Sequence, residues 1–190
     1  MNELIKQINE FAKYQYRRNS KLKVFALTDP KRSVSALVLE KELDINIEII
    51  LRTFGDENLI IDLKKPHRFF ATIGTRTARK YNIKGVHIPS KRKNNLNYKN
   101  QNINISASAH NLRQIHRALK FKADFILVSV AFFSKSPSAT SRPLGPIKIA
   151  NICRLFPKAN IIALGGINIK TAKRLEKIGI KGFAGVSFKN

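Results

Sequence analysis

The chain has 190 residues, of which 43% are hydrophobic and 25% charged, a composition typical of one globular domain with a substantial core. No apolar run approaches the roughly 20 residues that span a bilayer, so we expect no membrane partner. Charged and polar residues interrupt the N-terminal segment, which therefore lacks the apolar core of a secretory signal. The single cysteine, Cys153, cannot form an internal disulfide, and we expect a cytoplasmic protein.

The formal net charge of +24 has two interpretations. It can serve a polyanionic partner or steer phosphorylated substrates, or it can reflect a composition rich in Lys, Asn and Ile. The most basic segment, residues 89–104, is also rich in Asn, and we interpret it as a solvated surface connection. No base-stacking or groove-reading motif accompanies it, so a nucleic-acid partner is only an alternative.

Helical and extended patterns alternate from one end of the chain to the other. The first helix is indicated by apolar residues at helical spacing, such as Ile5, Ile8 and Phe11. Strands are predicted at residues 24–28, 47–53, 68–74, 85–89, 103–110, 123–132, 161–164 and 183–188. Between them, helices are predicted at 34–43 with Ser33 as a cap, at 57–65 ended by Pro66, and at 75–82. Another helix follows the cap Asn111, and the next extends from Pro146 to Phe156. The last helix contains Ala172, Leu175 and Ile178, with Asn168 or Thr171 as its cap and Gly179 as its end.

Eight strands, most of them followed by a helix, indicate a parallel sheet, and no hairpin signature interrupts the pattern. We therefore predict an α/β protein with a small, single-domain (β/α)₈ TIM barrel over residues 23–190, preceded by an N-terminal helix and lead-in over residues 1–22. A doubly wound open sheet is the alternative. Whether the chain forms a homo-oligomer stays open.

In such a barrel the chemistry lies at the C-terminal ends of the strands. Gly165 and Gly166 follow the seventh strand, where they can make a tight turn or let backbone N–H groups approach an anion. The loops after strands seven and eight often bind phosphate in barrels, which favours a phosphate site here. The same rule selects Asp29, Arg52, His87, His110, Ser187 and the loop Ser134–Arg142.

Each of these candidates also has a purely structural interpretation. Asp29 precedes a proline and can simply close its strand. His87 and His110 can be hydrogen-bonded residues of the barrel rim, whereas Arg52 at the end of an apolar strand needs a phosphate or carboxylate partner. We expect His67 and His116 at the surface and Cys153 in the core.

Several segments resemble, in order and spacing, the thiamine phosphate synthase/TenI superfamily. These are "VFALTD", "IILRTFGD", "NIKGVHIPS", "ISASAHN", "ADFILVSVAFFSKS", "IIALGGI" and "GFAGVS", which extend from Val24 to Ser187. Strand two and the Ser-rich loop that ends in Leu-Gly-Pro are most similar to a divergent branch of that superfamily.

The resemblance implies a transferase that joins a pyrimidine pyrophosphate to a thiazole phosphate and releases pyrophosphate. Gly165, Gly166, Val186 and Ser187 would then hold the phosphate of the thiazole, and His87, His110 and Arg142 would contact substrate. Arg52, Ser134 and Ser136 would be the catalytic residues, with Arg52 at the pyrophosphate. The implied cofactor is Mg²⁺.

The sequence departs from the family at the metal. Thr72-Ile73 stands where the family has an Asn-Asp pair, and Pro89-Ser90-Lys91-Arg92 stands in place of Gly-Gln-x-Asp. Both expected Mg²⁺ carboxylates are therefore absent, and no metal ligand is assigned. Three hypotheses remain: a thiamine biosynthetic enzyme, a catalytically degenerate module that binds a thiazole phosphate or thiamine phosphate, and a basic nucleic-acid-associated protein.

Overall fold

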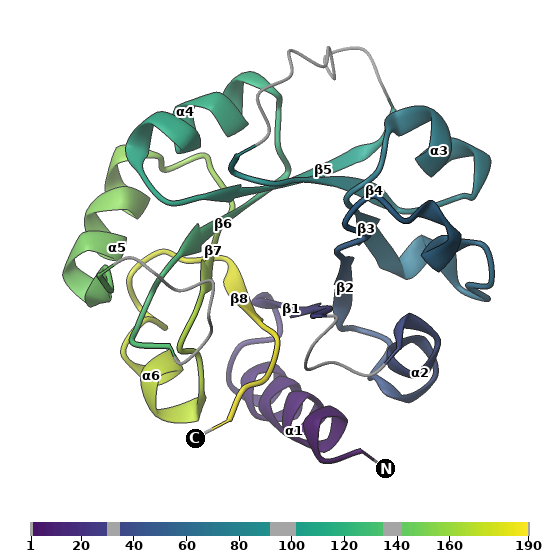
Figure 1. Ribbon diagram of the computed structural model, residues 1–190. Coiled ribbons are helices and arrows are strands. Elements are labelled where there is room, and N and C mark those ends of the chain that lie inside the picture. Colours follow the sequence, from purple (N-terminus) through teal and green to yellow (C-terminus); the bar gives the residue numbers. More distant parts are fainter. Residues whose placement is uncertain (1, 30–34, 92–101, 135–141, 190) are drawn as a thin grey trace.

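Eight parallel strands form a closed barrel in the computed structural model, which describes residues 2–29, 35–91, 102–134 and 142–189. Each strand pairs with its sequence neighbour, and β1 also pairs with β8. Figure 1 looks into this ring, with the helices around its outside. The predicted (β/α)₈ barrel is confirmed, and the open sheet is excluded by the β1–β8 pairing.

The strands are β1 (Lys23–Leu27), β2 (Glu48–Leu51), β3 (Phe69–Ala71), β4 (Gly85–Ile88), β5 (Asn104–Ala109), β6 (Phe125–Ser129), β7 (Ile161–Leu164) and β8 (Gly182–Gly185). The α-helices are α1 (Glu3–Arg18), α2 (Ala36–Glu42), α3 (Thr75–Lys80), α4 (Leu112–Lys120), α5 (Gly145–Leu155) and α6 (Ile169–Lys173). None of the helices in these described residues is long and apolar enough to cross a bilayer.

The interior of the barrel is packed with side chains. Phe25 of β1, Phe70 of β3 and Phe125 of β6 form an aromatic cluster there, and their ring centroids lie 5.1–6.1 Å apart. Gly85 makes room for this cluster, because a Cβ there would lie 2.7 Å from the Phe70 ring and 2.5 Å from the carbonyl oxygen of Asn104. This part of the barrel interior is therefore a packed core, as in other barrels of this kind.

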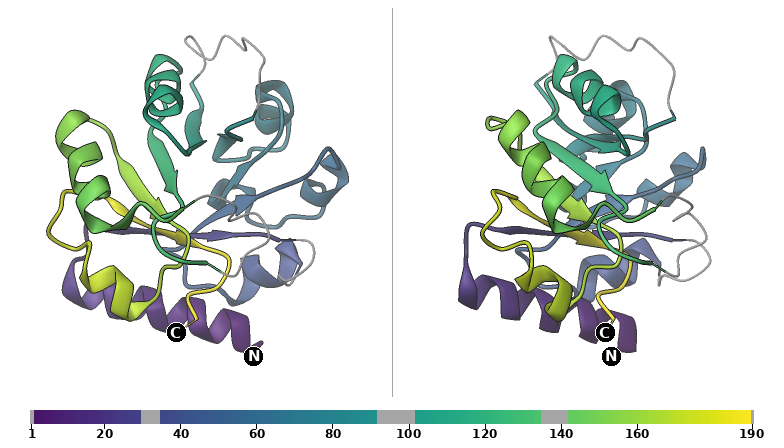
Figure 2. Two further views of the ribbon diagram at one scale, coloured as in Figure 1. Left: turned by 60° about the vertical axis from the view of Figure 1, so that its left-hand side comes forward. Right: turned by 90° about the vertical axis from the view of Figure 1, so that its left-hand side faces the viewer.

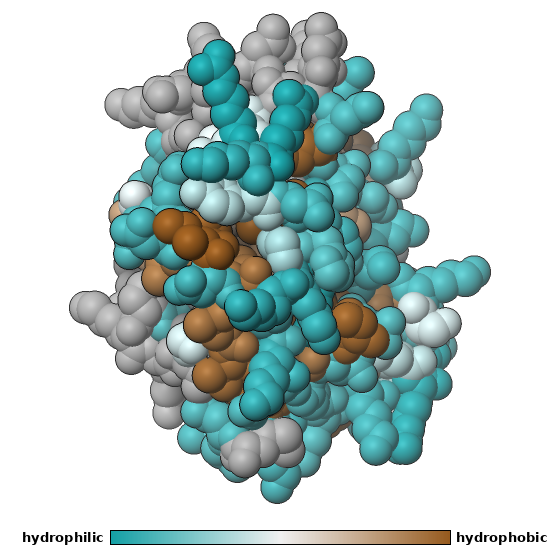
Figure 3. Space-filling view, turned by 90° about the vertical axis from the view of Figure 1, so that its right-hand side faces the viewer, coloured by the Kyte–Doolittle hydropathy of each residue, from teal (hydrophilic) through white to brown (hydrophobic). Residues whose placement is uncertain are grey.

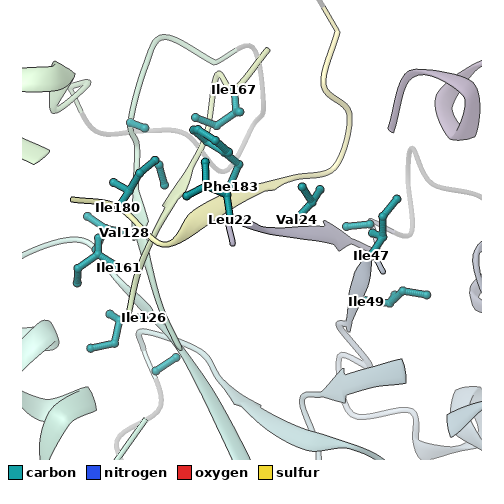
Figure 4. Close-up of a cluster of buried hydrophobic side chains, with 14 of the residues drawn as sticks. Leu22, Val24, Ile47, Ile49, Ile126, Val128, Ile161, Ile167, Ile180 and Phe183 are labelled. Atoms are coloured by element: carbon teal, nitrogen blue, oxygen red, sulfur yellow. The ribbon is translucent and has the colours of Figure 1, made fainter. Parts of the chain in front are cut away.

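A second, larger core lies between the strands and the helices. Successive residues of a strand point to opposite faces, so Val24 and Ala26 face outward while Phe25 and Leu27 face inward. Figure 4 shows members of this outer layer from five strands, including Ile49, Val128 and Phe183. The alternation also determines which polar residues face the interior, and this selects the candidate site.

Helix α1 packs against β1 and β8, at the position that a helix after β8 would occupy. Phe11 stacks on Phe188 with centroids 4.2 Å apart and meets Phe183 edge-on at 5.6 Å. Arg18 forms a bidentate salt bridge with Glu176, with the shortest contact at 2.8 Å. Figure 2 shows α1 beneath the barrel strands. The N-terminal helix thus completes the outer layer.

Several predicted boundaries are wrong. The predicted helix 57–65 is replaced by one 3₁₀ turn, Glu57–Ile60. A second 3₁₀ turn, Pro66–Arg68, follows, so Pro66 begins a turn rather than ending a helix. Gly74 belongs to the N-cap of α3 and not to β3. Ser35 caps α2, and the predicted cap Ser33 lies outside the described residues.

The end of the chain also differs from the prediction. Helix α6 ends at Lys173, and Leu175 and Ile178 lie in turns that lead to Gly179. The last strand begins at Gly182 and ends at Gly185, so Val186, Ser187 and Phe188 follow the strand instead of belonging to it. Asn168 caps α6 as predicted, in a capping box with Thr171.

Candidate functional site

The loop after β7 places two glycines at the barrel rim. Gly165 has φ +96° and Gly166 has φ +64°, both in a region that side chains with a Cβ rarely adopt. A Cβ on Gly166 would lie 2.3 Å from the carbonyl oxygen of Phe133, so the loop is pressed against the segment after β6. The Phe132 N–H donates to the Gly165 carbonyl at 3.0 Å, and the Thr171 hydroxyl donates to the Gly166 carbonyl at 2.9 Å.

These contacts use the carbonyl groups of the two glycines and leave their N–H groups available. Within the part of the chain that the structure describes, the N–H groups of Gly165, Gly166, Val186 and Ser187 donate no hydrogen bond. Leu164 pairs with Ala184, so the loops after β7 and β8 leave the sheet side by side. We call these four residues the glycine cup. Available N–H groups on a tightly held loop are suited to an anion.

Arg52 lies on the other side of the barrel, after β2. Its Nε donates to the carbonyl of Thr28 at 2.5 Å, and its Nη2 forms an ion pair with Asp29 at 3.5 Å. Nη2 is buried but makes no hydrogen bond to the described residues. Burial lowers the pKa of the guanidinium and Asp29 opposes that effect. Asp29 therefore has a specific partner beyond closing its strand, and the predicted carboxylate partner of Arg52 is found.

Two threonines join the ends of β2 and β3. The Thr53 N–H donates to the Thr72 hydroxyl at 2.8 Å, and the two hydroxyl oxygens lie 3.0 Å apart. Thr53 is buried, with 2% of its surface exposed. Thr72 stands at the Asn of the family's Asn-Asp pair, and its hydroxyl takes part in the strand-to-strand hydrogen bonding. The position of the carboxylate is occupied by Ile73, which is buried.

His87 points into the barrel and is buried, with 3% of its surface exposed. Its two ring nitrogens lie 2.9 Å from the hydroxyl oxygens of Ser106 and Ser108, so one nitrogen donates and the other accepts. Burial, followed by the charge of Arg52, lowers the pKa of His87 to about 3. His87 is therefore a neutral hydrogen-bonded group near neutral pH, unsuited to general acid catalysis there.

His110 is exposed and lies after β5. Its Nδ1 lies 2.9 Å from the hydroxyl of Ser129 and 3.2 Å from the carbonyl of the same residue. This contact ties the ends of β5 and β6 together. His110 thus has a structural partner and also faces solvent, where a ligand can reach it.

The remaining candidates are placed less completely. Ser134 is half-buried after β6, Arg142 is exposed before α5, and Ser136 lies outside the described residues. His67 and His116 are exposed, as predicted, and His116 meets the Phe156 ring edge-on at 4.9 Å. Cys153 is buried, as predicted, and burial raises the pKa of its thiol. A raised pKa makes Cys153 a poor nucleophile.

Mg²⁺ binds carboxylate oxygens, so we tested whether the described residues can supply them. None of these residues forms a group of three or more His, Cys, Asp or Glu side chains that could hold a metal. Asp29 is already paired with Arg52, and Thr72 is bonded to Thr53. The donor set does not fit a Mg²⁺ site made by the protein, and we derive no step through the metal.

The sequence analysis missed Thr53, Thr72, Ser106 and Ser108. For Thr72 and Ser108 the signal was present in the strand alternation, because each follows, two positions later, a residue that faces the interior. Thr72 follows Phe70, and Ser108 follows Ser106. A cavity of about 450 Å³ was also unforeseen. It lies at the opposite end of the barrel, beside Lys23, Glu48 and Lys84 at the starts of the strands.

Comparison with known proteins identifies the family of the chain. The profile of the thiamine monophosphate synthase (TMP-TENI) family matches residues 69–188. The thiamine-phosphate synthase of Methanococcus maripaludis is 27% identical over 180 residues, which cover 88% of this chain and 86% of that protein.

Two solved structures share the fold. Thiamine phosphate pyrophosphorylase from Pyrococcus furiosus matches with a TM-score of 0.65 and 22% identity, over 86% of this chain and 85% of that one. The enzyme of the same name from Bacteroides thetaiotaomicron matches with a TM-score of 0.57 and 19% identity, over 86% and 82% of the two chains. The family profile covers more than half of the chain, and the chain belongs to the thiamine monophosphate synthase/TenI family.

Proposed function

We propose that the glycine cup binds the phosphate of a thiazole phosphate or of thiamine phosphate, and that the protein couples a thiazole phosphate to a pyrimidine pyrophosphate. The observation that carries this proposal is the set of available N–H groups at Gly165, Gly166, Val186 and Ser187, on adjacent loops at the C-terminal end of the barrel. Backbone N–H groups recognise phosphate without a charged side chain. Family membership supplies the class of ligand.

In the coupling reaction, the bond between the pyrimidine methylene carbon and the pyrophosphate oxygen breaks, and the pyrophosphate leaves with the electron pair. The thiazole nitrogen then donates its lone pair to that carbon and becomes quaternary. Arg52 is our candidate for the leaving group, because its guanidinium is charged, partly buried and held at the end of β2 by Thr28 and Asp29. A preorganised cation at a developing negative charge is an effective form of catalysis.

Calorimetric titration with thiamine phosphate at physiological salt tests the cup. We expect saturable binding at one site in the unmodified protein. Ser187→Asp adds a carboxylate to the cup at an exposed position and should weaken binding at least tenfold, or about 1.4 kcal/mol. Ser20→Asp adds the same charge at the opposite end of the barrel and serves as the matched control. Absence of binding to the unmodified protein would refute the proposal.

A second assay separates binding from turnover. Pyrophosphate release is measured from a thiazole phosphate and a pyrimidine pyrophosphate, with and without Mg²⁺, in the unmodified protein and in Arg52→Gln. Release that depends on Arg52 supports the coupling reaction. Tight binding without release under either condition leaves the phosphate cup in place and rejects the transferase. That outcome identifies a binding module, which the unsuitable Mg²⁺ donor set favours as the second candidate function.

A further inference from the structure

The positive charge of the chain is unevenly distributed along the sequence. Residues 1–62 contain ten acidic and ten basic side chains and are formally neutral. Residues 63–190 contain 26 Lys and Arg against two acids, Asp124 and Glu176, and so carry the entire +24. A general drift of composition would distribute the 12 acidic residues over the whole chain. Their concentration in the first third indicates that one part of the molecule is basic for a reason of its own.

The fold converts this division along the sequence into a division in space. The neutral part comprises α1, β1, α2 and β2 on one side of the barrel, and the basic part comprises the strands and helices from β3 onward (Figure 1). Within the basic part, residues 63–123 have no acidic residue and 15 basic ones. Two of its outer helices, α3 and α4, flank β4 and β5.

Helices α3 and α4 each present a short row of cations. In α3 these are Arg76, Arg79 and Lys80, and in α4 they are Arg113, Arg117 and Lys120. Within each helix the spacing of three or four residues places the side chains on one face. All six are at least partly exposed, and among the described residues none is within salt-bridge distance of a carboxylate. We call these six residues the α3–α4 face.

The α3–α4 face is also rich in arginine. Four of its six cations are Arg, whereas the whole chain has 13 Arg among 36 basic residues. The planar guanidinium binds phosphate through paired N–H groups, which an ammonium cannot do. We propose that the α3–α4 face binds the phosphate backbone of nucleic acid, independently of the glycine cup and without reading base sequence.

Two observations favour nucleic acid over an anionic membrane. No large hydrophobic side chain of α3 is exposed, and α4 exposes only Leu112 and Leu119, so the face offers two apolar groups beside six cations to a lipid interface. The surface in Figure 3, onto which α3 faces, is mostly hydrophilic, and its hydrophobic groups are separated from one another. A face of this kind gives binding that is dominated by phosphate contacts and is strongly dependent on salt.

The test is fluorescence anisotropy of a labelled 20-nucleotide single-stranded RNA, titrated with full-length protein between 50 and 200 mM salt. The variant Arg76→Gln/Arg79→Gln/Arg113→Gln/Lys120→Gln removes four exposed charges whose side chains have no hydrogen bond or ion pair to the described residues. If the four cations contact phosphates, the slope of log K against log salt should decrease by about 3, since each contact contributes about 0.7 for a single strand.

The matched control removes four exposed cations from the neutral side. Lys6→Gln/Lys13→Gln/Arg17→Gln/Lys21→Gln has the same net charge as the first variant and should keep the original salt slope. Equal weakening by both variants would overturn the assignment of the face, because net charge alone would explain it. Absence of RNA binding at 50 mM salt would overturn it too, as would tighter binding to phosphatidylserine vesicles than to RNA. Thermal unfolding of both variants checks that the fold is retained.

Discussion

Gly166→Ala tests whether the glycine cup is built on close backbone packing. Gly166 has φ +64°, and a non-glycine residue in the left-handed region costs about 1–2 kcal/mol. The added Cβ would lie 2.3 Å from the Phe133 carbonyl oxygen and 2.8 Å from two atoms of Phe132, all of them backbone atoms. Overpacking of this kind costs a further 1–3 kcal/mol or so. The free energy of unfolding should therefore fall by about 2–5 kcal/mol.

Two other glycines separate these contributions. Gly74 has an ordinary negative φ of −75° and open space around its missing Cβ, so Gly74→Ala should change stability by less than about 0.5 kcal/mol. Gly55 has φ +95° and also has open space, so Gly55→Ala should show the backbone cost alone, about 1–2 kcal/mol. Urea denaturation with linear extrapolation measures all three variants.

The order of the three values decides the argument. If Gly166→Ala is no more destabilising than Gly55→Ala, then the loop after β7 does not rest on Phe132 and Phe133 as described. If the order holds, thiamine phosphate affinity in Gly166→Ala should fall as well, because the N–H groups of the cup move when the loop shifts. Unchanged affinity in a destabilised variant would show that phosphate binds elsewhere.

Three further predictions concern the barrel interior and α1. Because folded His87 stays neutral down to about pH 3 whereas an unfolded histidine takes up a proton near pH 6.5, the unfolded state binds more protons between these values. Stability should therefore fall as pH decreases through this window, by up to about 1.4 kcal/mol per pH unit, and His87→Gln should flatten the curve in urea denaturation at pH 4–7. Thr72→Val leaves the buried Thr53 N–H without its acceptor and should cost about 1–3 kcal/mol, whereas Thr72→Ser should cost much less in the same assay. Phe11→Ala removes the ring stacked on Phe188 and should cost about 3–5 kcal/mol by thermal or urea unfolding; a cost below 1 kcal/mol would contradict the role of α1 as the last outer helix.

The fold was predictable because its signals are local and repeated. Apolar runs such as "VFAL" in β1, "FILV" in β6 and "IIAL" in β7 are strands that the barrel buries on both faces, and they recur along the chain. One incorrect prediction concerns the segment between β2 and β3. Between β2 and β3 the sequence "DENLIIDLKKPHR" has apolar residues at helical spacing, yet Pro66 and the short distance to β3 leave room for 3₁₀ turns only.

The candidate site was predictable only in part, since it depends on which residues meet across the barrel. The end-of-strand rule found Arg52, His87 and the glycine pair. It did not find that Asp29 pairs with Arg52, or that the buried His87 is hydrogen-bonded to two serines from β5. These contacts join residues about 20 positions apart. The contacts of His87 follow from the parallel register His87↔Ser106, and the Asp29–Arg52 pair follows from the pairing of β1 with β2.

The two sides of the barrel rim differ in what maintains them. On the β7–β8 side the available groups are backbone N–H groups, and the conformation of the two glycines is fixed by positive φ angles and by contact with the segment after β6. A change there disturbs the fold itself. On the β2–β3 side the polar groups belong to side chains, and the Thr72 hydroxyl accepts a hydrogen bond from the Thr53 N–H. The two sides can therefore change independently of each other, and among the described residues the glycine cup has available N–H groups while no cluster of side chains fits Mg²⁺.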